Sequence, residues 1–203
     1  MPPFAAPLLF VAAAYLIGSL SFAVIVSRLL SMADPRSYGS GNPGATNVLR
    51  SGRKLAALLT LSGDSLKAVL AIAAARQAGL PDAWLAAVAV AVTVGHMWPV
   101  FFRFHGGKGV ATAAGVLLTL DWRLGLGTLL VWLLIAASSR ISSLAALVAA
   151  LAAPLACATL LPGQPAILVA VLIIAALLIQ RHKQNLLNLI HGRESRIGDK
   201  AKS

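Results

Sequence analysis

Apolar runs about as long as a membrane-crossing helix recur along the whole chain, and they limit its fold more than any other feature. Hydrophobic residues make up 59% of the 203 residues and charged residues only 11%, whereas soluble domains carry about a quarter charged residues. A helix needs about 20 apolar residues to cross a bilayer. A soluble helical protein could not bury so many apolar helices in one core. We therefore predict an all-α integral membrane protein.

The runs predict seven transmembrane helices in a single polytopic domain over residues 1–203. The fourth and fifth are short for full spans, so one of them could be tilted or partly re-entrant. A six-span alternative would move the N-terminus to the other side of the membrane. The predicted helices are Phe4–Leu30, Lys54–Ala75, Ala83–Phe104, Gly109–Leu120, Leu124–Ser139, Ser143–Leu161 and Pro165–Arg181.

The basic residues predict how the helices are oriented. The chain has 17 Lys and Arg against six Asp and Glu, a formal net charge of +11. With seven spans, only Arg76 and Arg123 fall outside the basic side, apart from Lys67 within a helix. The basic side faces the cytoplasm under the positive-inside rule. We therefore expect the N-terminus outside, the C-terminus cytoplasmic and a mobile tail over 193–203.

The charge does not predict nucleic-acid binding, because aromatic side chains that could stack on bases are not interleaved with the basic residues. The lone cysteine, Cys157, lies in an apolar run and has no partner for a disulfide or a metal site. We expect no metal and no cofactor.

A glycine-rich connection follows the first predicted helix and has the composition of an anion-binding loop. Its glycines allow close backbone approach to a ligand, and Arg50 offers a fork that suits phosphate oxygens. The spacing also matches GxGxxG, but the preceding segment is an apolar helix rather than the strand of a dinucleotide fold. A plain flexible turn is the alternative. The loop residues are Gly39, Ser40, Gly41, Asn42, Pro43, Gly44, Ala45, Thr46 and Asn47.

A second glycine-rich connection, 103–112, holds Lys108 among three glycines where a helix begins, a position that favours anions. The alternative is a basic residue in a simple turn. Upstream, His96 precedes Pro99, and we interpret it as a buried, hydrogen-bonded scaffold residue. Asp64 and Lys67 lie three residues apart within the second helix. Intramembrane charges are usually paired, so we expect these two to pair with each other or with a group on another helix.

Two further basic segments belong to the same predicted face. Ser142 and Ser143 follow Arg140, and either could cap a helix or contact a ligand. Arg181, His182 and Asn185 close the last helix and group a guanidinium, an imidazole and a carboxamide. Basic residues that simply follow the end of a transmembrane helix would explain Arg181 but not Asn185. Together, the four basic segments predict one cationic basin above apolar helices.

Three stretches resemble signature regions of the bacterial acyl-phosphate:glycerol-3-phosphate acyltransferases, the PlsY family. They are GSGNPGATNVLR at 39–50, GHMWPVFFRFHGGKGVAT at 95–112 and RHKQNLLNL at 181–189. The resemblance covers nearly the whole chain and also includes Asp64, Lys67 and the Arg140–Leu144 segment. It departs from the family where Leu144-Ala145-Ala146 follows Ser143 and at Asn188, where a basic residue is common.

The resemblance implies a phospholipid-biosynthesis enzyme of the bacterial inner membrane, with its active site facing the cytoplasm. It would transfer a fatty acyl group from acyl phosphate to the sn-1 hydroxyl of glycerol 3-phosphate. Lysophosphatidic acid and phosphate are the implied products. It implies catalytic roles for His182, Ser40 and Lys108. Acyl phosphate would be held by Ser40, Gly41, Asn42, Gly44, Ala45, Thr46 and Asn47. Glycerol 3-phosphate would be held by Arg50, Lys108, Ser142 or Ser143, His182, Asn185 and Arg181.

The residues alone allow two other functions. An anion or organophosphate transporter would use the same cationic basin, although repeat-built transporter folds usually leave an internal repeat in the sequence. A non-catalytic subunit could bind anionic lipid headgroups instead. Either the donor phosphate or His182 could take the hydroxyl proton during acyl transfer. We expect a monomer surrounded by membrane lipids.

Overall fold

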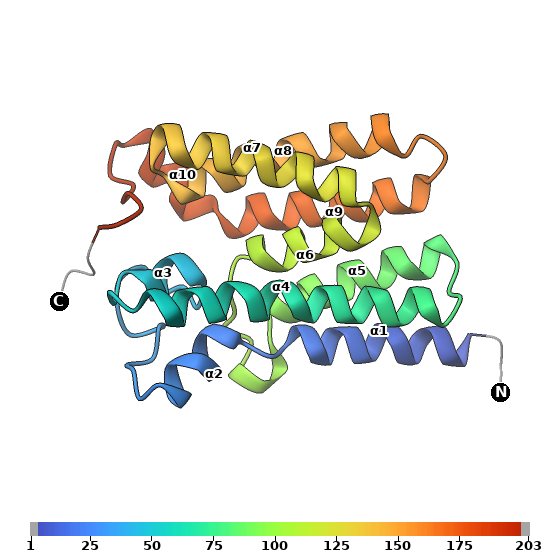
Figure 1. Cartoon of the computed structure of the whole chain (residues 1–203), viewed down its shortest axis with the longest axis horizontal. Coiled ribbons are helices and arrows are strands. Elements are labelled where there is room, and N and C mark those ends of the chain that lie inside the picture. The colour runs from blue at the N-terminus through green and yellow to red at the C-terminus, as the bar shows by residue number, and fades with distance from the viewer. Residues whose placement is uncertain (1–3, 200–203) are drawn as a thin grey trace.

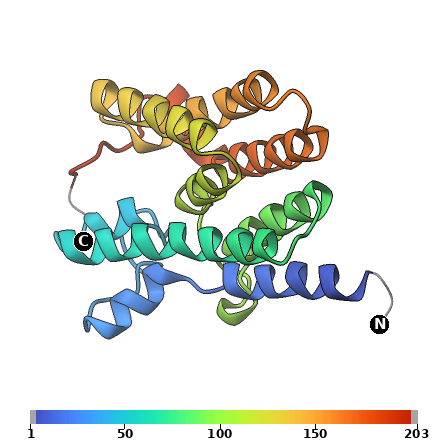
Figure 2. The ribbon, with the colours of Figure 1, turned by 45° about the vertical axis from the view of Figure 1, so that its right-hand side comes forward.

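The computed structural model describes residues 4–199, and every regular element among them is a helix. The helices lie side by side in an elongated bundle, with the two termini at opposite ends of its long axis (Figures 1 and 2). The elements are α1 (Ala5–Gly18), α2 (Phe22–Leu29), α3 (Ala45–Leu49), α4 (Lys54–Gln77), α5 (Asp82–Met97), the 3₁₀ turn η1 (Val100–Phe102), α6 (Val110–Leu120), α7 (Trp122–Ser139), α8 (Ser142–Leu160), α9 (Pro165–Arg181) and α10 (Lys183–Ile190).

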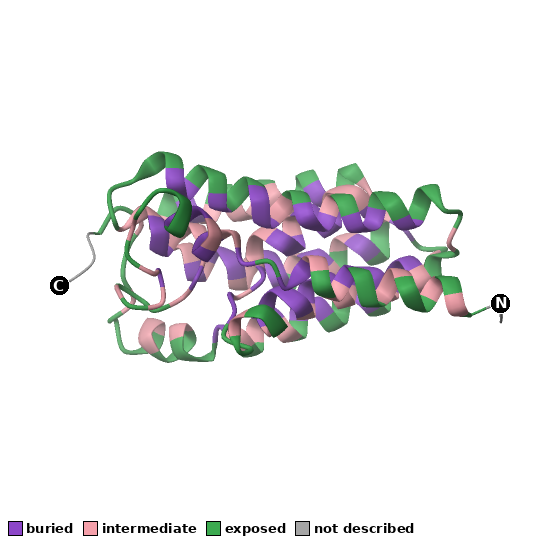
Figure 3. Ribbon diagram, turned by 90° about the horizontal axis from the view of Figure 1, so that it is seen from below, coloured by how far each residue is buried: buried purple, intermediate pink, exposed green. Residues whose placement is uncertain are grey.

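The exposed surface of the bundle is apolar, as the sequence predicts for a membrane protein. Leu155 on α8 is 72% exposed and Leu8 on α1 is 55% exposed. Buried residues instead follow the inward faces of the helices (Figure 3). Exposed leucines at this density would be unfavourable in water but suit contact with lipid tails.

Four helices in the described chain are long and apolar enough to cross a membrane: α4, α5 extended through η1, α7 and α8. The count rises to six if each bent pair, α1 with α2 and α9 with α10, is one span. The one remaining predicted span, the fourth, corresponds to α6, which is apolar but has only eleven residues. That is too short for a straight crossing.

The first predicted helix, Phe4–Leu30, is broken rather than continuous. The axes of α1 and α2 differ by 45° across Ser19–Ser21. The break frees the carbonyl of Leu20, which accepts a hydrogen bond from Lys67 Nζ at 2.8 Å. The intramembrane lysine therefore satisfies a backbone group that the helix leaves unpaired.

The third predicted helix, Ala83–Phe104, ends earlier than expected. Its regular part stops at Met97, because Pro99 disfavours helical geometry in the residue before it. Trp98 accordingly has φ −131° and ψ 70°. The chain turns through η1 and reaches α6 by a loop that contains Lys108. The short helices α3 and α10 were not predicted, and both lie at the same end of the bundle as this loop (Figure 1).

Candidate functional site

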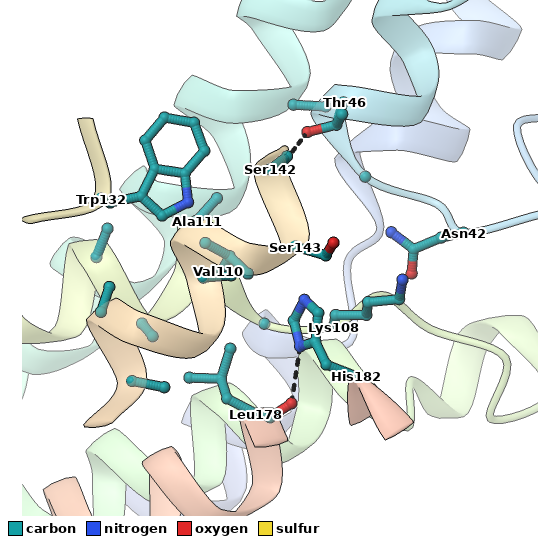
Figure 4. Close-up of a pocket in the computed structure, with 18 of the residues that line it drawn as sticks. Asn42, Thr46, Lys108, Val110, Ala111, Trp132, Ser142, Ser143, Leu178 and His182 are labelled. Carbon is teal, nitrogen blue, oxygen red and sulfur yellow. Dashed lines mark hydrogen bonds between the residues drawn. The ribbon is translucent and has the colours of Figure 1, made fainter. Parts of the chain in front are cut away.

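A cavity of about 660 Å³ opens at the end of the bundle where α3 and α10 lie. Its mouth is polar and its inner part is lined by helix side chains (Figure 4). All four predicted basic segments contribute to its wall. The polar lining residues are Ser40, Asn42, Thr46, Asn47, Arg50, Lys108, Thr128, Ser142, Ser143, His182, Asn185, Asn188, Arg193, Glu194 and Ser195, together with Asp64 and His96.

Asn47 holds the glycine-rich loop in shape. Its side chain is buried, accepts a hydrogen bond from Ser40 N at 2.9 Å, and donates to Pro35 O at 2.7 Å. Gly39 has φ +59°, and a Cβ there would lie 2.3 Å from Asn47 Oδ1. A glycine is therefore required at position 39. Hydrogen bonds of the Asn47 side chain therefore connect the two ends of the loop to the residues before it.

The remaining loop residues divide between two hollows. Asn42, Gly44, Ala45 and Thr46 line the main cavity with Ser40. Gly41 lies instead in a shallower hollow beside Arg36 and Tyr38, on the far side of Ser40. The loop residues predicted to bind acyl phosphate therefore line the main cavity, except for Gly41.

The Lys108 loop is fixed from both sides. A Cβ on Gly107 would lie 2.2 Å from His96 Nε2, so the backbone passes directly over the His96 ring. Arg181 donates to the carbonyls of Gly106 at 2.8 Å and Gly107 at 3.1 Å. The Arg181 guanidinium also lies 5.5 Å from the centre of the Trp98 ring. Arg181 thus contacts the loop backbone and is not part of the cavity wall.

His96 belongs to a buried ionic cluster under the cavity. Lys67 Nζ donates to Asp64 Oδ1 at 2.9 Å, to His96 Nδ1 at 2.9 Å and to Leu20 O at 2.8 Å. These three bonds use all three ammonium donors. The predicted Asp64–Lys67 pair is confirmed, and His96 is buried and hydrogen-bonded as expected, with its ring also in the cavity lining.

Lys108 projects into the cavity and bonds to Asn185, with 2.5 Å between Nζ and Oδ1. Burial lowers the pKa of the Lys108 ammonium to about 8. The carboxylate of Glu194 opposes this shift, while the guanidinium groups of Arg181 and Arg50 add to it. A lysine that is less strongly hydrated and already surrounded by cationic groups is well suited to bind a dianionic phosphate.

His182 lies at the junction of α9 and α10, which are bent by 57°. Its ring is buried, and Nδ1 is 2.8 Å from Leu178 O. A carbonyl can only accept, so Nδ1 carries the proton. The other nitrogen, Nε2, is then an acceptor in the neutral ring. The ring lines the cavity close to Lys108 and Ser143 (Figure 4).

The two serines at the start of α8 have different partners. Ser142 Oγ is 3.1 Å from Thr46 Oγ1, which links α8 to the glycine-rich loop. Ser143 Oγ donates to Glu194 Oε1 at 2.8 Å. Residue Ile141 precedes the helix without a side-chain cap, so neither serine has the capping role that the sequence allowed.

Arg50 reaches the cavity from the end of α3. One of its terminal nitrogens, Nη2, bonds to Ser195 Oγ. Its Nε is buried and has no hydrogen-bond partner among residues 4–199. A buried donor without a partner is unfavourable, so this guanidinium retains capacity for a ligand.

The C-terminal segment is part of the site, which the sequence did not predict. Residues Arg193, Glu194, Ser195 and Ile197 line the cavity mouth. Ile197 N donates to Arg140 O at 2.6 Å, and this bond attaches the segment to the α7–α8 junction. Residues 200–203 of the expected mobile tail lie outside the described residues. No local sequence pattern distinguishes Glu194 from the other polar residues of this tail.

Below the polar mouth the cavity continues as an apolar arm between α6, α7, α8 and α9. One wall consists of small residues on α8, which leave room for a ligand between the helices. The side chains lining the arm include Leu117, Leu129, Trp132, Ala146, Ala149, Ala150, Ala153, Ile174 and Leu178. The cavity as a whole can therefore hold a phosphorylated molecule at its mouth and a hydrocarbon chain in its arm.

Comparison with known proteins identifies similar sequences over almost the whole chain. A family described as "Glycerol-3-phosphate acyltransferase" matches residues 8–192. A glycerol-3-phosphate acyltransferase of Burkholderia cenocepacia is 60% identical over 192 residues, covering 94% of this chain and 90% of that protein. One from Cupriavidus taiwanensis is 59% identical over 201 residues, covering 97% and 99%.

Two solved structures have the same fold. Both are of PlsY (YgiH), described as an integral membrane glycerol 3-phosphate acyltransferase. Its glycerol 3-phosphate form has a TM-score of 0.89 at 39% identity and covers 96% of each chain. Its lysophosphatidic acid form has a TM-score of 0.87 at 38% identity, covering 96% of this chain and 97% of that one.

Proposed function

Because the chain belongs to the glycerol-3-phosphate acyltransferase family, we propose that it acylates the sn-1 hydroxyl of glycerol 3-phosphate, with acyl phosphate as the donor. The products are lysophosphatidic acid and inorganic phosphate. The observation that carries this proposal is the single cavity, in which a cationic mouth continues into an apolar arm. Family membership also favours an enzyme over a transporter or a lipid-binding subunit.

The mouth has donors for two phosphate groups. Lys108 and the partly unpartnered Arg50 bind the phosphate of glycerol 3-phosphate, assisted by Asn185 and Ser143. The glycine-rich loop on the adjoining wall holds the phosphate of the acyl donor, whose hydrocarbon chain enters the arm. This arrangement brings the acceptor hydroxyl to the donor carbonyl, and proximity of this kind lowers the barrier strongly.

The chemical step needs no protein nucleophile, because an acyl phosphate is already activated. The hydroxyl oxygen attacks the acyl carbonyl carbon, the anhydride bond from that carbon to the phosphate oxygen breaks, and inorganic phosphate leaves. His182 Nε2 accepts a hydrogen bond from the attacking hydroxyl and orients it, since Nδ1 is held by Leu178 O. The hydroxyl proton passes either to this nitrogen or to the departing phosphate.

The proposed topology follows from the distribution of charge and the ends of the bundle. The seven predicted apolar segments cross the bacterial inner membrane, with α6 as a short segment enclosed by its neighbours. An N-terminus outside and a C-terminus inside agree with termini at opposite ends of the bundle. The cavity mouth then faces the cytoplasm, where glycerol 3-phosphate is dissolved, and the monomer contains a complete site.

An assay with purified protein tests the donor assignment. Palmitoyl phosphate, palmitoyl-CoA and palmitoyl-acyl carrier protein are each offered with labelled glycerol 3-phosphate. We expect labelled lysophosphatidic acid from palmitoyl phosphate alone, with one phosphate released per product. Product formed equally well from a thioester donor would contradict the acyl-phosphate assignment, although not the family.

A further inference from the structure

The cavity mouth contains an acidic residue that the family-based assignment of substrate contacts does not use. Glu194 follows α10 by four residues, in a segment with mostly exposed side chains. Its carboxylate nevertheless turns inward. The Oε1 atom accepts hydrogen bonds from Ser143 Oγ at 2.8 Å and from Asn185 Nδ2 at 2.7 Å.

This contact determines which way the Asn185 amide faces. The amide has one donor group and one acceptor oxygen. Because its nitrogen donates to Glu194, its oxygen is turned towards Lys108 Nζ, 2.5 Å away. A rotated amide would present its hydrogens to the ammonium and repel it. Glu194, Asn185 and Lys108 thus form a chain in which each bond sets the orientation of the next.

The rest of the segment is positioned to hold Glu194 in place. Ser195 bonds to Arg50, and Ile197 bonds to the backbone oxygen of Arg140. The segment therefore connects α3 with the α7–α8 junction across the cavity mouth. The carboxylate itself bonds to groups from two other parts of the chain, Ser143 on α8 and Asn185 on α10.

We propose that Glu194 is a positioning residue for the acyl-transfer reaction, which acts through Asn185 and Ser143 to hold the Lys108 ammonium towards glycerol 3-phosphate. This inference rests on the proposed function. The C-terminal segment would then contribute to substrate binding as well as to the fold. Its loss should weaken the use of glycerol 3-phosphate more than the use of the acyl donor.

The charge of Glu194 also acts on Lys108. The charged and titratable groups around the Lys108 ammonium are Glu194 on the C-terminal segment, Arg50 at the end of α3, and Arg181 and His182 at the end of α9. Glu194 is the only anion in this group, and it raises the pKa of Lys108 against the lowering effect of burial and of the two guanidinium groups. Removing the anion should lower that pKa further.

The test compares the wild type with Glu194→Gln, which keeps an acceptor oxygen at the same distance but removes the charge. We expect the KM for glycerol 3-phosphate to rise about 10-fold, as the loss of one charge-assisted hydrogen bond implies. The KM for acyl phosphate should change less than about twofold. In the wild type, kcat/KM for glycerol 3-phosphate should fall as Lys108 loses its proton, near its pKa of about 8. In Glu194→Gln this alkaline limb of the pH profile should lie roughly one pH unit lower.

Two further variants separate positioning from simple support of the fold. Glu194→Asp keeps the charge and should leave the alkaline limb at its wild-type pH. Asp199→Asn removes a charge from the same segment, where Asp199 accepts a bond from Arg196 N outside the cavity. It should match the wild type in every parameter. Thermal unfolding of each variant in the same detergent measures the fold separately.

A double-mutant cycle tests the route through Asn185. In an Asn185→Ala background, Glu194→Gln should raise the KM by clearly less than it does in the wild type, because linked residues are not additive. Additive effects, or a Glu194→Gln enzyme with an unshifted alkaline limb and an unchanged KM, would overturn the inference. If the wild type itself made no lysophosphatidic acid, the proposed function would fail instead.

Discussion

Replacing Lys108 with alanine should weaken the use of glycerol 3-phosphate specifically. The Lys108 ammonium is half-buried in the cavity mouth and bonded to the Asn185 oxygen. A hydrogen bond to a charged group contributes about 1.5–3 kcal/mol, which corresponds to a roughly 10- to 150-fold change in an equilibrium constant. We expect the KM for glycerol 3-phosphate to rise by that factor, with a smaller effect on the KM for acyl phosphate.

Lys183→Ala is a matched control for this variant. Lys183 begins α10 at the same end of the bundle, is exposed, and is not part of the cavity wall. Removing its charge changes the overall potential by the same amount without touching the site. The assay is phosphate release at saturating acyl phosphate with glycerol 3-phosphate varied. A Lys108→Ala enzyme with unchanged KM and turnover would refute the assignment.

The pH dependence gives a second readout of the same lysine. The Lys108 side chain is cationic below its pKa of about 8 and neutral above it. The profile of kcat/KM reports groups in the free enzyme, so kcat/KM for glycerol 3-phosphate should fall as the pH rises through about 8. In Lys108→Arg the guanidinium stays charged, and this alkaline limb should disappear below about pH 10. A limb that stays in place would assign the titration to another group.

Three other changes test the remaining parts of the site. His182→Gln separates the two proton acceptors: a rate above about a tenth of wild type means that the donor phosphate takes the proton, because loss of a general base costs roughly 10²–10⁴. Gly107→Ala places a Cβ 2.2 Å from His96 Nε2, so activity should be lost and the melting temperature lowered; wild-type behaviour would show that the loop is not fixed by this contact. Ala150→Phe fills the apolar arm, so kcat/KM should fall about 10-fold or more for hexadecanoyl phosphate and much less for an octanoyl donor; equal losses would place the chain elsewhere.

The sequence predicted most of the cavity mouth, because glycines and basic residues clustered in short connections between apolar runs. It also predicted the Asp64–Lys67 pair from spacing alone. Asn47 shows the limit of such reasoning. Its residue type suggested a ligand contact, but its side chain is occupied by Ser40, Pro35 and Tyr38 within the loop. Whether a polar side chain faces the ligand or the loop depends on tertiary contacts.

The features that the sequence did not predict depend on contacts between distant segments. Glu194 reaches Ser143 across 51 positions, and no local pattern in a polar tail indicates such a contact. At the break between α1 and α2, Lys67 donates a hydrogen bond to the carbonyl of Leu20, 47 residues away. The sequence also did not predict the apolar arm, because alanines that line a cavity have the same spacing as alanines that pack against a helix.

The central claim is that both phosphorylated substrates meet in this one cavity. A structure of the protein with glycerol 3-phosphate and a non-reactive acyl phosphonate tests it most directly. We predict the glycerol 3-phosphate phosphate within hydrogen-bond distance of Lys108 and Arg50, the phosphonate against the Ser40–Asn47 loop, and the hydrocarbon chain along the alanines of α8. Either ligand bound outside the cavity, or an acyl chain lying on the outer surface of the bundle, would contradict the account.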